Sequence, residues 1–241
     1  MRIDSYAHGN RWRQIHPGSK GLLVLFSLIA ALLSRHPAIP LLIALIMSGL
    51  ILLGAGIPWR GYLRLLALPL AFLLWSCLLL LVTFSPIGLN RSELPLVQLV
   101  LSRSLGALCT LLFFALTTPL SEIAGLLRTI GVPRLFVELM VIAYRQIFIL
   151  LDAFSQIRTA QEARLGYRSF KVSWRSAAEL AGNILIKTVV RARHNHQALL
   201  ARGYDQELRF LSPQRHLSRW HLFGAATLGS FFILLAWQVQ P

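Results

Sequence analysis

The sequence has little acid and almost no lysine. Only 9 residues are Asp or Glu, against 24 that are Lys or Arg, and the lysines are Lys20, Lys171 and Lys187 alone. The resulting net charge of +15 is typical of proteins that meet nucleic acid, an anionic lipid surface or an acidic protein. Because 56% of the residues are hydrophobic and only 14% are charged, a soluble nucleic-acid binder is excluded and a membrane protein is indicated.

Several kinds of chemistry are missing as well. The two cysteines, Cys77 and Cys109, lie in apolar runs, which is typical of buried free thiols rather than of a disulfide or metal framework. No Gly-Lys dipeptide occurs, so a phosphate-binding loop of the Walker type cannot be built. His-Glu-x-x-His and Gly-x-Ser-x-Gly are also absent. If the chain takes part in active transport, we therefore expect another chain to hydrolyse the ATP.

Uncharged or nearly uncharged runs predict an all-α polytopic protein with about five membrane helices. The runs are residues 21–34, 37–59, 65–90, 94–119 and 222–239. The first run lacks a small-residue cleavage site at its far end, so we expect it to stay as a membrane helix. Arg103 interrupts the fourth run, and its side chain is expected to snorkel from near the outer end.

The placement of Arg and Lys predicts the orientation. With the N-terminus in the cytoplasm, nearly all of the basic residues lie inside, as the positive-inside rule requires. The predicted organisation is a cytoplasmic N-terminal segment (1–20), membrane helices one to four (21–119), a helical cytoplasmic unit (120–220) and a last membrane helix (221–239). The stretch 133–152 is apolar but carries three charges. We expect it to run from the membrane surface into the cytoplasm, and a sixth span there remains open.

The two long helices predicted in the cytoplasmic unit end alike. They cover about residues 133–164 and 173–202, with a short amphipathic helix before them from Ser121 that the Gly-Val-Pro sequence at 131–133 stops. Residues 160–167 read Ala-Gln-Glu-Ala-Arg-Leu-Gly-Tyr, and residues 198–204 read Ala-Leu-Leu-Ala-Arg-Gly-Tyr. Both ends therefore consist of Ala-x-x-Ala-Arg, then glycine, then tyrosine, with one extra residue in the first copy.

Each part of this repeated end has a physical use. Alanines three residues apart give a slim helical edge that can enter a narrow groove. Arginine at a helix C-terminus suits the helix dipole and can bind a carboxylate with two hydrogen bonds. Glycine after the last turn permits the left-handed conformation that ends a helix. The pattern predicts two docking ends for acidic partners.

With these motifs, the chain resembles the CbiQ/EcfT family, the transmembrane (T) components of energy-coupling factor transporters. The N-terminal stretch Ile3-Asp4-Ser5-Tyr6-Ala7, followed by Asn10, Arg11 and His16-Pro17, resembles the cobalt-type (CbiQ) branch, and the similarity continues through 145–152 and 198–205. In that family, two Ala-Arg-Gly motifs end two coupling helices, and each docks in a groove of one ATPase subunit. By position the matching residues are Ala163, Arg164, Gly166, Ala201, Arg202 and Gly203. The first copy departs from the pattern, because Leu165 separates the arginine from the glycine.

The resemblance implies a non-catalytic subunit of an ATP-driven importer in the bacterial inner membrane. Its implied partners are two ATPase subunits, a substrate-binding (S-type) membrane subunit and a small accessory membrane subunit, with no nucleic acid and no cofactor. The implied substrate is a transition-metal ion, cobalt before nickel, and a vitamin-type importer is the alternative. No cluster of His, Cys or acidic residues suits metal selection, and His194 and His196 face apart on a helix. We expect the partner to bind the ion.

Two other classes of function stay open. A polytopic enzyme acting on lipids would need a convergent acid/base set, for which Asp152, Glu162, Asp205 and Glu207 are the available acids. All four lie in the basic unit, where pairing with arginine is the simpler explanation. A membrane anchor that merely recruits acidic proteins would explain the basic surface, but it would not need two matching helix ends.

Overall fold

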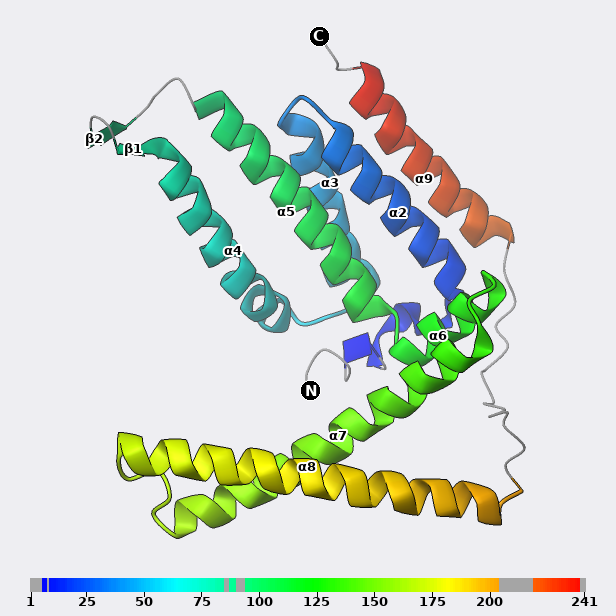
Figure 1. The fold of residues 1–241 in the computed structure, drawn as a ribbon. Coiled ribbons are helices and arrows are strands. Elements are labelled where there is room, and N and C mark those ends of the chain that lie inside the picture. The colour runs from blue at the N-terminus through cyan, green and yellow to red at the C-terminus, as the bar shows by residue number, and fades with distance from the viewer. Residues whose placement is uncertain (1–5, 8, 85–86, 90–93, 204–218, 239–241) are drawn as a thin grey trace. The chain divides into compact units, whose positions relative to one another are not determined.

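The computed structural model describes residues 6–7, 9–84, 87–89, 94–203 and 219–238 (Figure 1). The N-terminal Ile3-Asp4-Ser5 and the acids Asp205 and Glu207, singled out above, lie outside these residues. The chain divides into two compact units. One comprises Met1–Leu126 with Pro213–Pro241, and the other comprises Leu127–Ser212.

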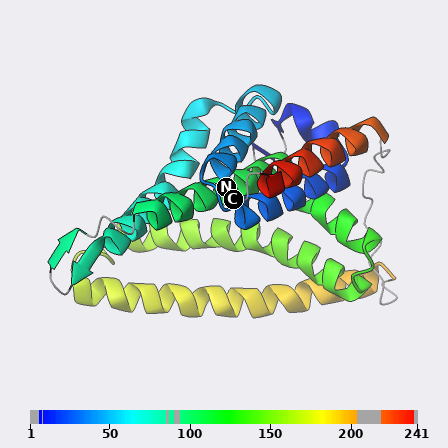
Figure 2. The ribbon, with the colours of Figure 1, turned by 90° about the horizontal axis from the view of Figure 1, so that it is seen from above.

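The first unit is a bundle of apolar helices. Its elements are η1 (Arg11–Gln14), α2 (Pro17–Leu33), α3 (Ala38–Gly49), the π-helical turn η2 (Leu50–Gly54), α4 (Trp59–Leu81), β1 (Val82–Phe84), β2 (Ile87–Leu89), α5 (Leu94–Thr117) and α9 (Arg219–Gln238). Helix α6 (Leu120–Thr129) begins in the first unit and ends in the second, which starts at Leu127. The second unit holds α7 (Arg134–Ala163) and α8 (Phe170–Ala201), joined by a short turn (Figure 2).

Five apolar helices of the first unit coincide with the five predicted runs. Within the described residues, α4 and α5 are long and apolar enough to cross a membrane, and Pro17–Leu33, Ala38–Gly54 and Leu222–Gln238 are shorter apolar helices. Short helices fit a bilayer by local thinning and by snorkelling of flanking residues. The all-α architecture of a polytopic membrane protein is therefore confirmed.

The structure differs from the second and third predicted runs. The run 65–90 does not continue as helix to its end, because α4 stops at Leu81 and an antiparallel hairpin follows, in which Thr83 pairs with Gly88. The second predicted run, 37–59, also ends early, since η2 ends at Gly54, Gly56 has a φ of +71° and Trp59 already begins α4. Gly131, with a φ of +94°, likewise follows the end of α6.

Helix α2 is the centre of the first unit, where it packs between α5 and α9 (Figure 1). Small residues on α2 permit close contact: Ala30, Ala31 and Ser27 are almost completely buried. Gly106 of α5 brings its backbone so near to α3 that an added Cβ would lie 2.8 Å from the carbonyl oxygen of Pro40. Close backbone approach through small residues is how membrane helices gain packing contacts without a hydrophobic driving force.

Candidate functional site

The two long helices of the second unit end in nearly the same backbone conformation. Helix α7 ends at Ala163, with Arg164 as its C-cap (φ −93°, ψ 16°), and α8 ends at Ala201, with Arg202 as its C-cap (φ −95°, ψ 10°). Both arginine side chains are exposed. Each guanidinium therefore stands beside the negative end of a helix dipole and is accessible to an acidic partner.

The residue after each arginine adopts the left-handed conformation. At the second end this residue is Gly203 (φ +73°), as the sequence predicted. At the first end it is Leu165 (φ +58°). In the part of the chain that the structure describes, Leu165 has a positive φ although it is not a glycine. The structural counterpart of Gly203 is thus Leu165, which differs from the expectation that Gly166 would end the helix.

The hydrogen bonds at the end of α7 explain why leucine is held in this conformation. The amide of Leu165 donates to the carbonyl oxygen of Glu162 at 3.0 Å, and the amide of Gly166 donates to that of Gln161 at 2.8 Å. These two bonds form a Schellman motif, which satisfies carbonyls that the helix itself leaves without donors. The motif needs a left-handed residue after the C-cap, and placing leucine there costs about 1–2 kcal/mol.

Gly166 serves a different purpose, which is close approach between α7 and α8. A Cβ at this position would lie 2.9 Å from both the carbonyl oxygen of Gln161 and the Oγ of Ser176. The Ser176 hydroxyl donates to the carbonyl oxygen of Gly166 at 2.7 Å, so α8 is bonded directly to the turn. Only a residue without a side chain fits between these groups.

Gln161 extends this contact into a small network, which we call the clasp (Gln161, Gly166, Tyr167 and Ser176). Its Nε2 donates to the carbonyl oxygen of Ser176 at 2.9 Å, and its Oε1 accepts from the Tyr167 hydroxyl at 2.8 Å. The clasp holds the end of α7 against the first turns of α8. Sequence reasoning missed Gln161 and Ser176 because neither belongs to the repeated pattern.

Ion pairs and exposure account for the acids near this site. Glu162 accepts a hydrogen bond from Arg158 at 2.9 Å, one helical turn away, and both side chains are at least half exposed. The Arg158 guanidinium also lies 6.0 Å from the centre of the Tyr167 ring. Asp152 is exposed on α7. Glu162 is thus paired with arginine, as expected.

The described residues offer no evident metal site. No group of three His, Cys, Asp or Glu side chains in this part of the chain could hold a metal ion. His194 and His196 are both exposed on α8.

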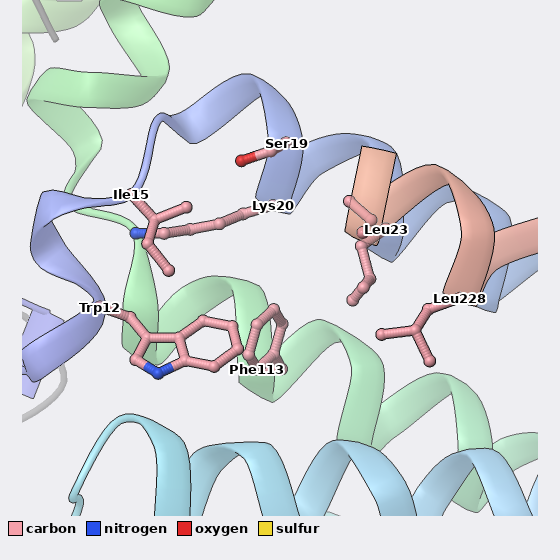
Figure 3. A pocket seen from close by; sticks show the side chains of 9 residues that line it. Trp12, Ile15, Ser19, Lys20, Leu23, Phe113 and Leu228 are labelled. Atoms are coloured by element: carbon pink, nitrogen blue, oxygen red, sulfur yellow. The ribbon is translucent and has the colours of Figure 1, made fainter. Parts of the chain in front are cut away.

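The first unit contains a cavity of about 170 Å³ (Figure 3). Apolar side chains of Trp12, Leu23, Phe113 and Leu228 form most of its walls, and Lys20 and Ser19 lie on one side. Among the described residues no carboxylate or histidine lines it. The Lys20 ammonium donates to the carbonyl oxygen of Thr117 at 2.8 Å, so it binds the end of α5.

Comparison with known proteins agrees with this architecture. The family model for CbiQ, described as a cobalt transport protein, matches residues 9–212. An uncharacterised protein of Methanocaldococcus jannaschii is 28% identical over 99% of this chain and 93% of its own length. A cobalt transport protein CbiQ of Rhodobacter capsulatus is 33% identical over 88% of each chain. A putative fused cobalt transport protein CbiMQ of Methanocorpusculum labreanum is 30% identical over 90% of this chain and 38% of its own length.

The family match runs from η1 through α2 to α8, including both twin helix ends, and stops before α9. Helices α2 to α5 and the basic helical hairpin described above are therefore parts of one family architecture. The chain is a polytopic membrane protein and belongs to the CbiQ family of cobalt transport proteins.

Proposed function

We propose that this chain is the transmembrane coupling component of an ATP-driven importer of the energy-coupling factor type. Two ATPase subunits bind the twin helix ends, one at Ala163-Arg164-Leu165-Gly166 and the other at Ala201-Arg202-Gly203. The observation that carries the proposal is the matched geometry of these ends: an exposed arginine as C-cap, followed at once by a left-handed residue. Each arginine binds acidic residues in an ATPase groove.

Helices α7 and α8 transmit the motion of the ATPase subunits. They contain 30 and 32 residues, which corresponds to rigid rods about 45 and 48 Å long. When the ATPases close on ATP, each groove displaces the helix end that it holds. The rods carry this displacement to the membrane helices, which tilt or release a separate substrate-binding subunit. The chain itself is not catalytic, and its partners hydrolyse the ATP.

The family match supports a transition-metal ion as substrate, with cobalt before nickel; a vitamin is the alternative substrate class. The ion is bound by the partner membrane subunit, and a small accessory membrane subunit completes the assembly. The name of the fused relative, which joins CbiM to CbiQ, supports a second membrane component beside this one. The strong bias of basic residues supports an inner-membrane location with a cytoplasmic N-terminus.

The test is a pull-down of the candidate ATPase by the detergent-extracted full chain. We compare the wild type with Arg164→Glu, Arg202→Glu and the double variant. Arg193→Glu is the matched control, because Arg193 is an exposed arginine on α8 away from either end. Each single variant is expected to reduce the amount of ATPase bound per chain, and the double variant is expected to lose it. Equal binding by all five proteins would disprove docking through the twin ends.

A further inference from the structure

Beside the Arg164 end, the turn between α7 and α8 exposes a cluster of large apolar side chains. Phe170 and Trp174 lie one helical turn apart at the start of α8, and their rings meet edge to face with centroids 6.4 Å apart. Phe170 is 81% exposed and Trp174 is 66% exposed. Leu165, also 66% exposed, lies directly after Arg164. We call Leu165, Phe170 and Trp174 the apolar tip. Exposed apolar clusters of this kind mark binding surfaces.

Basic residues flank the apolar tip in the sequence. Residues 163–178 contain Arg164, Arg168, Lys171 and Arg175 and no acidic residue. Arg175 is paired with Glu179 at 3.0 Å, whereas the Arg164 side chain is exposed and directly precedes Leu165 in the sequence. An apolar centre with a charged rim is the usual anatomy of a protein–protein interface. The complementary surface is an apolar pocket bordered by carboxylates.

The clasp gives this surface a fixed shape. Gln161 and Ser176 bond α7 to α8 on either side of the turn, and the Schellman motif sets the backbone of Leu165. Arg164 and the apolar tip are therefore presented on one pre-organised turn, which lowers the entropy lost on binding. A fluid lipid surface requires no such fixed arrangement, whereas a shaped protein pocket does.

We propose that the apolar tip enters the same ATPase groove as Arg164 and forms the apolar centre of that contact. This inference rests on the proposed function, because it takes the ATPase as the partner of the Arg164 end. The groove then has two features, carboxylates for Arg164 and an apolar pocket for Phe170 and Trp174. Contacts with buried aromatic residues at their centre hold most of the affinity of an interface. Phe170 and Trp174 are accordingly specificity-determining residues of this end.

The test isolates the Arg164 end by working in the Arg202→Glu background, with the full chain in detergent and the purified ATPase. In that background we measure the affinity of Phe170→Ser combined with Trp174→Ser. The matched control is Leu185→Ser combined with Ile186→Ser, since these residues are 66% and 63% exposed on the same helix. The aromatic pair is expected to weaken binding at least about 10-fold and the control less than about twofold. Trp174→Phe is expected to keep most of the affinity.

Three outcomes separate the two proposals. If the aromatic double variant binds as tightly as its background, while adding Arg164→Glu abolishes binding, the apolar tip is not in the groove and the proposed function stands. If adding Arg164→Glu also leaves binding unchanged, the ATPase does not dock through the Arg164 end, and the proposed function itself is disproved. The third outcome concerns lipid. Brominated lipids quench the fluorescence of tryptophans that touch the membrane, so we compare the wild type with Trp174→Phe in brominated nanodiscs with the ATPase bound. If the wild type shows a quenched component that Trp174→Phe lacks, Trp174 contacts lipid and the inference is overturned.

Discussion

The Lys20 ammonium donates a hydrogen bond to the carbonyl oxygen of Thr117 at 2.8 Å, and it does so from a side chain that is only 2% exposed. A similar bond between the same two helices lies at the C-terminal end of α2. There, the Nε of Arg103 donates to the carbonyl oxygen of Ser34 at 2.9 Å. Lys20, in the first turn of α2, thus caps the C-terminal end of α5, and Arg103, within α5, caps the C-terminal end of α2. At both ends the helix dipole is negative and carbonyls lack helical donors.

Replacing Lys20 by methionine is expected to lower the free energy of unfolding by about 1–3 kcal/mol, because a buried carbonyl loses its charged donor. Thermal unfolding of the purified protein in detergent measures the change. Lys187→Met is the control, since Lys187 is exposed on α8 and its loss should cost less than about 0.5 kcal/mol. Equal melting temperatures for the two variants would show that the Lys20 bond adds nothing to stability.

Arg103→Met is expected to cost less than Lys20→Met, about 1 kcal/mol, because Arg103 is only partly buried and water can replace its hydrogen bond. The bonds made by Lys20 and Arg103 lie at opposite ends of α2, which are about 20 Å apart. Sites at that distance act independently, so the double variant should lose the sum of the two single effects. A double variant that departs from the sum by more than about 0.5 kcal/mol would contradict independent capping.

Gly166→Ala is expected to loosen the junction of α7 and α8, because the new Cβ would lie 2.9 Å from two oxygen atoms. Amide hydrogen exchange over residues 161–176 measures the loss of protection. Gly182→Ala provides the control. Gly182 lies within α8 with open space where a Cβ would be, so alanine should slow amide exchange in that helix. Unchanged exchange at 161–176 in Gly166→Ala would mean that the clasp does not hold the two helices together.

Leu165→Gly is expected to stabilise the second unit while weakening the proposed contact with the ATPase. Glycine relieves the strain of the left-handed conformation, which stabilises the folded state by about 1–2 kcal/mol. It also gives the unfolded chain more conformational freedom, which lowers the stability by about 0.5–1 kcal/mol. The net gain is therefore about 0–1.5 kcal/mol, measurable as slower amide exchange in the hairpin. Leu200→Gly, in the last helical turn of α8, should instead destabilise by about 1 kcal/mol. A Leu165→Gly variant that exchanges faster than the wild type would contradict the strain argument.

The sequence was sufficient to predict the five apolar helices and the C-terminal ends of α7 and α8, because these depend on local features. Apolar length determines a membrane helix, and α7 and α8 stop at the residues where Ala-Arg patterns predicted an end. The sequence was not sufficient to predict which residue is left-handed at the first end. Matching glycine with glycine selected Gly166, whereas the backbone hydrogen bonds of Gln161 and Glu162 place Leu165 there.

Contacts between distant segments could not be predicted in the same way. Nothing in the residues around Lys20 indicates that its partner is a carbonyl 97 positions later in the chain. The hairpin pairing Val82–Phe84 with Ile87–Leu89 lies inside a run whose composition is that of a membrane helix. Arg103 was expected to snorkel, and the structure adds a protein partner in Ser34. Each of these contacts depends on how helices pack, which local composition does not specify.

A polar cluster links three helices inside the apolar bundle. The Tyr62 hydroxyl on α4 lies 2.7 Å from the Ser48 Oγ on α3 and donates to the Cys109 Sγ on α5 at 3.4 Å. Tyr62→Phe and Ser48→Ala should each destabilise the protein, by about 0.6 kcal/mol, which is typical of hydrogen bonds between membrane helices. The double variant should lose less than the sum, because both changes remove the same bond.

The control for this double-mutant cycle is Ser230→Ala. The Ser230 hydroxyl is exposed, and its hydrogen bonds remain within α9, to the carbonyl oxygens of Ala226 and Thr227. Combined with Tyr62→Phe, it should give a purely additive result. Unfolding in a detergent titration series measures all of the variants. If Tyr62→Phe with Ser48→Ala is additive as well, the 2.7 Å contact contributes no coupling energy, and the three helices are held together by packing alone.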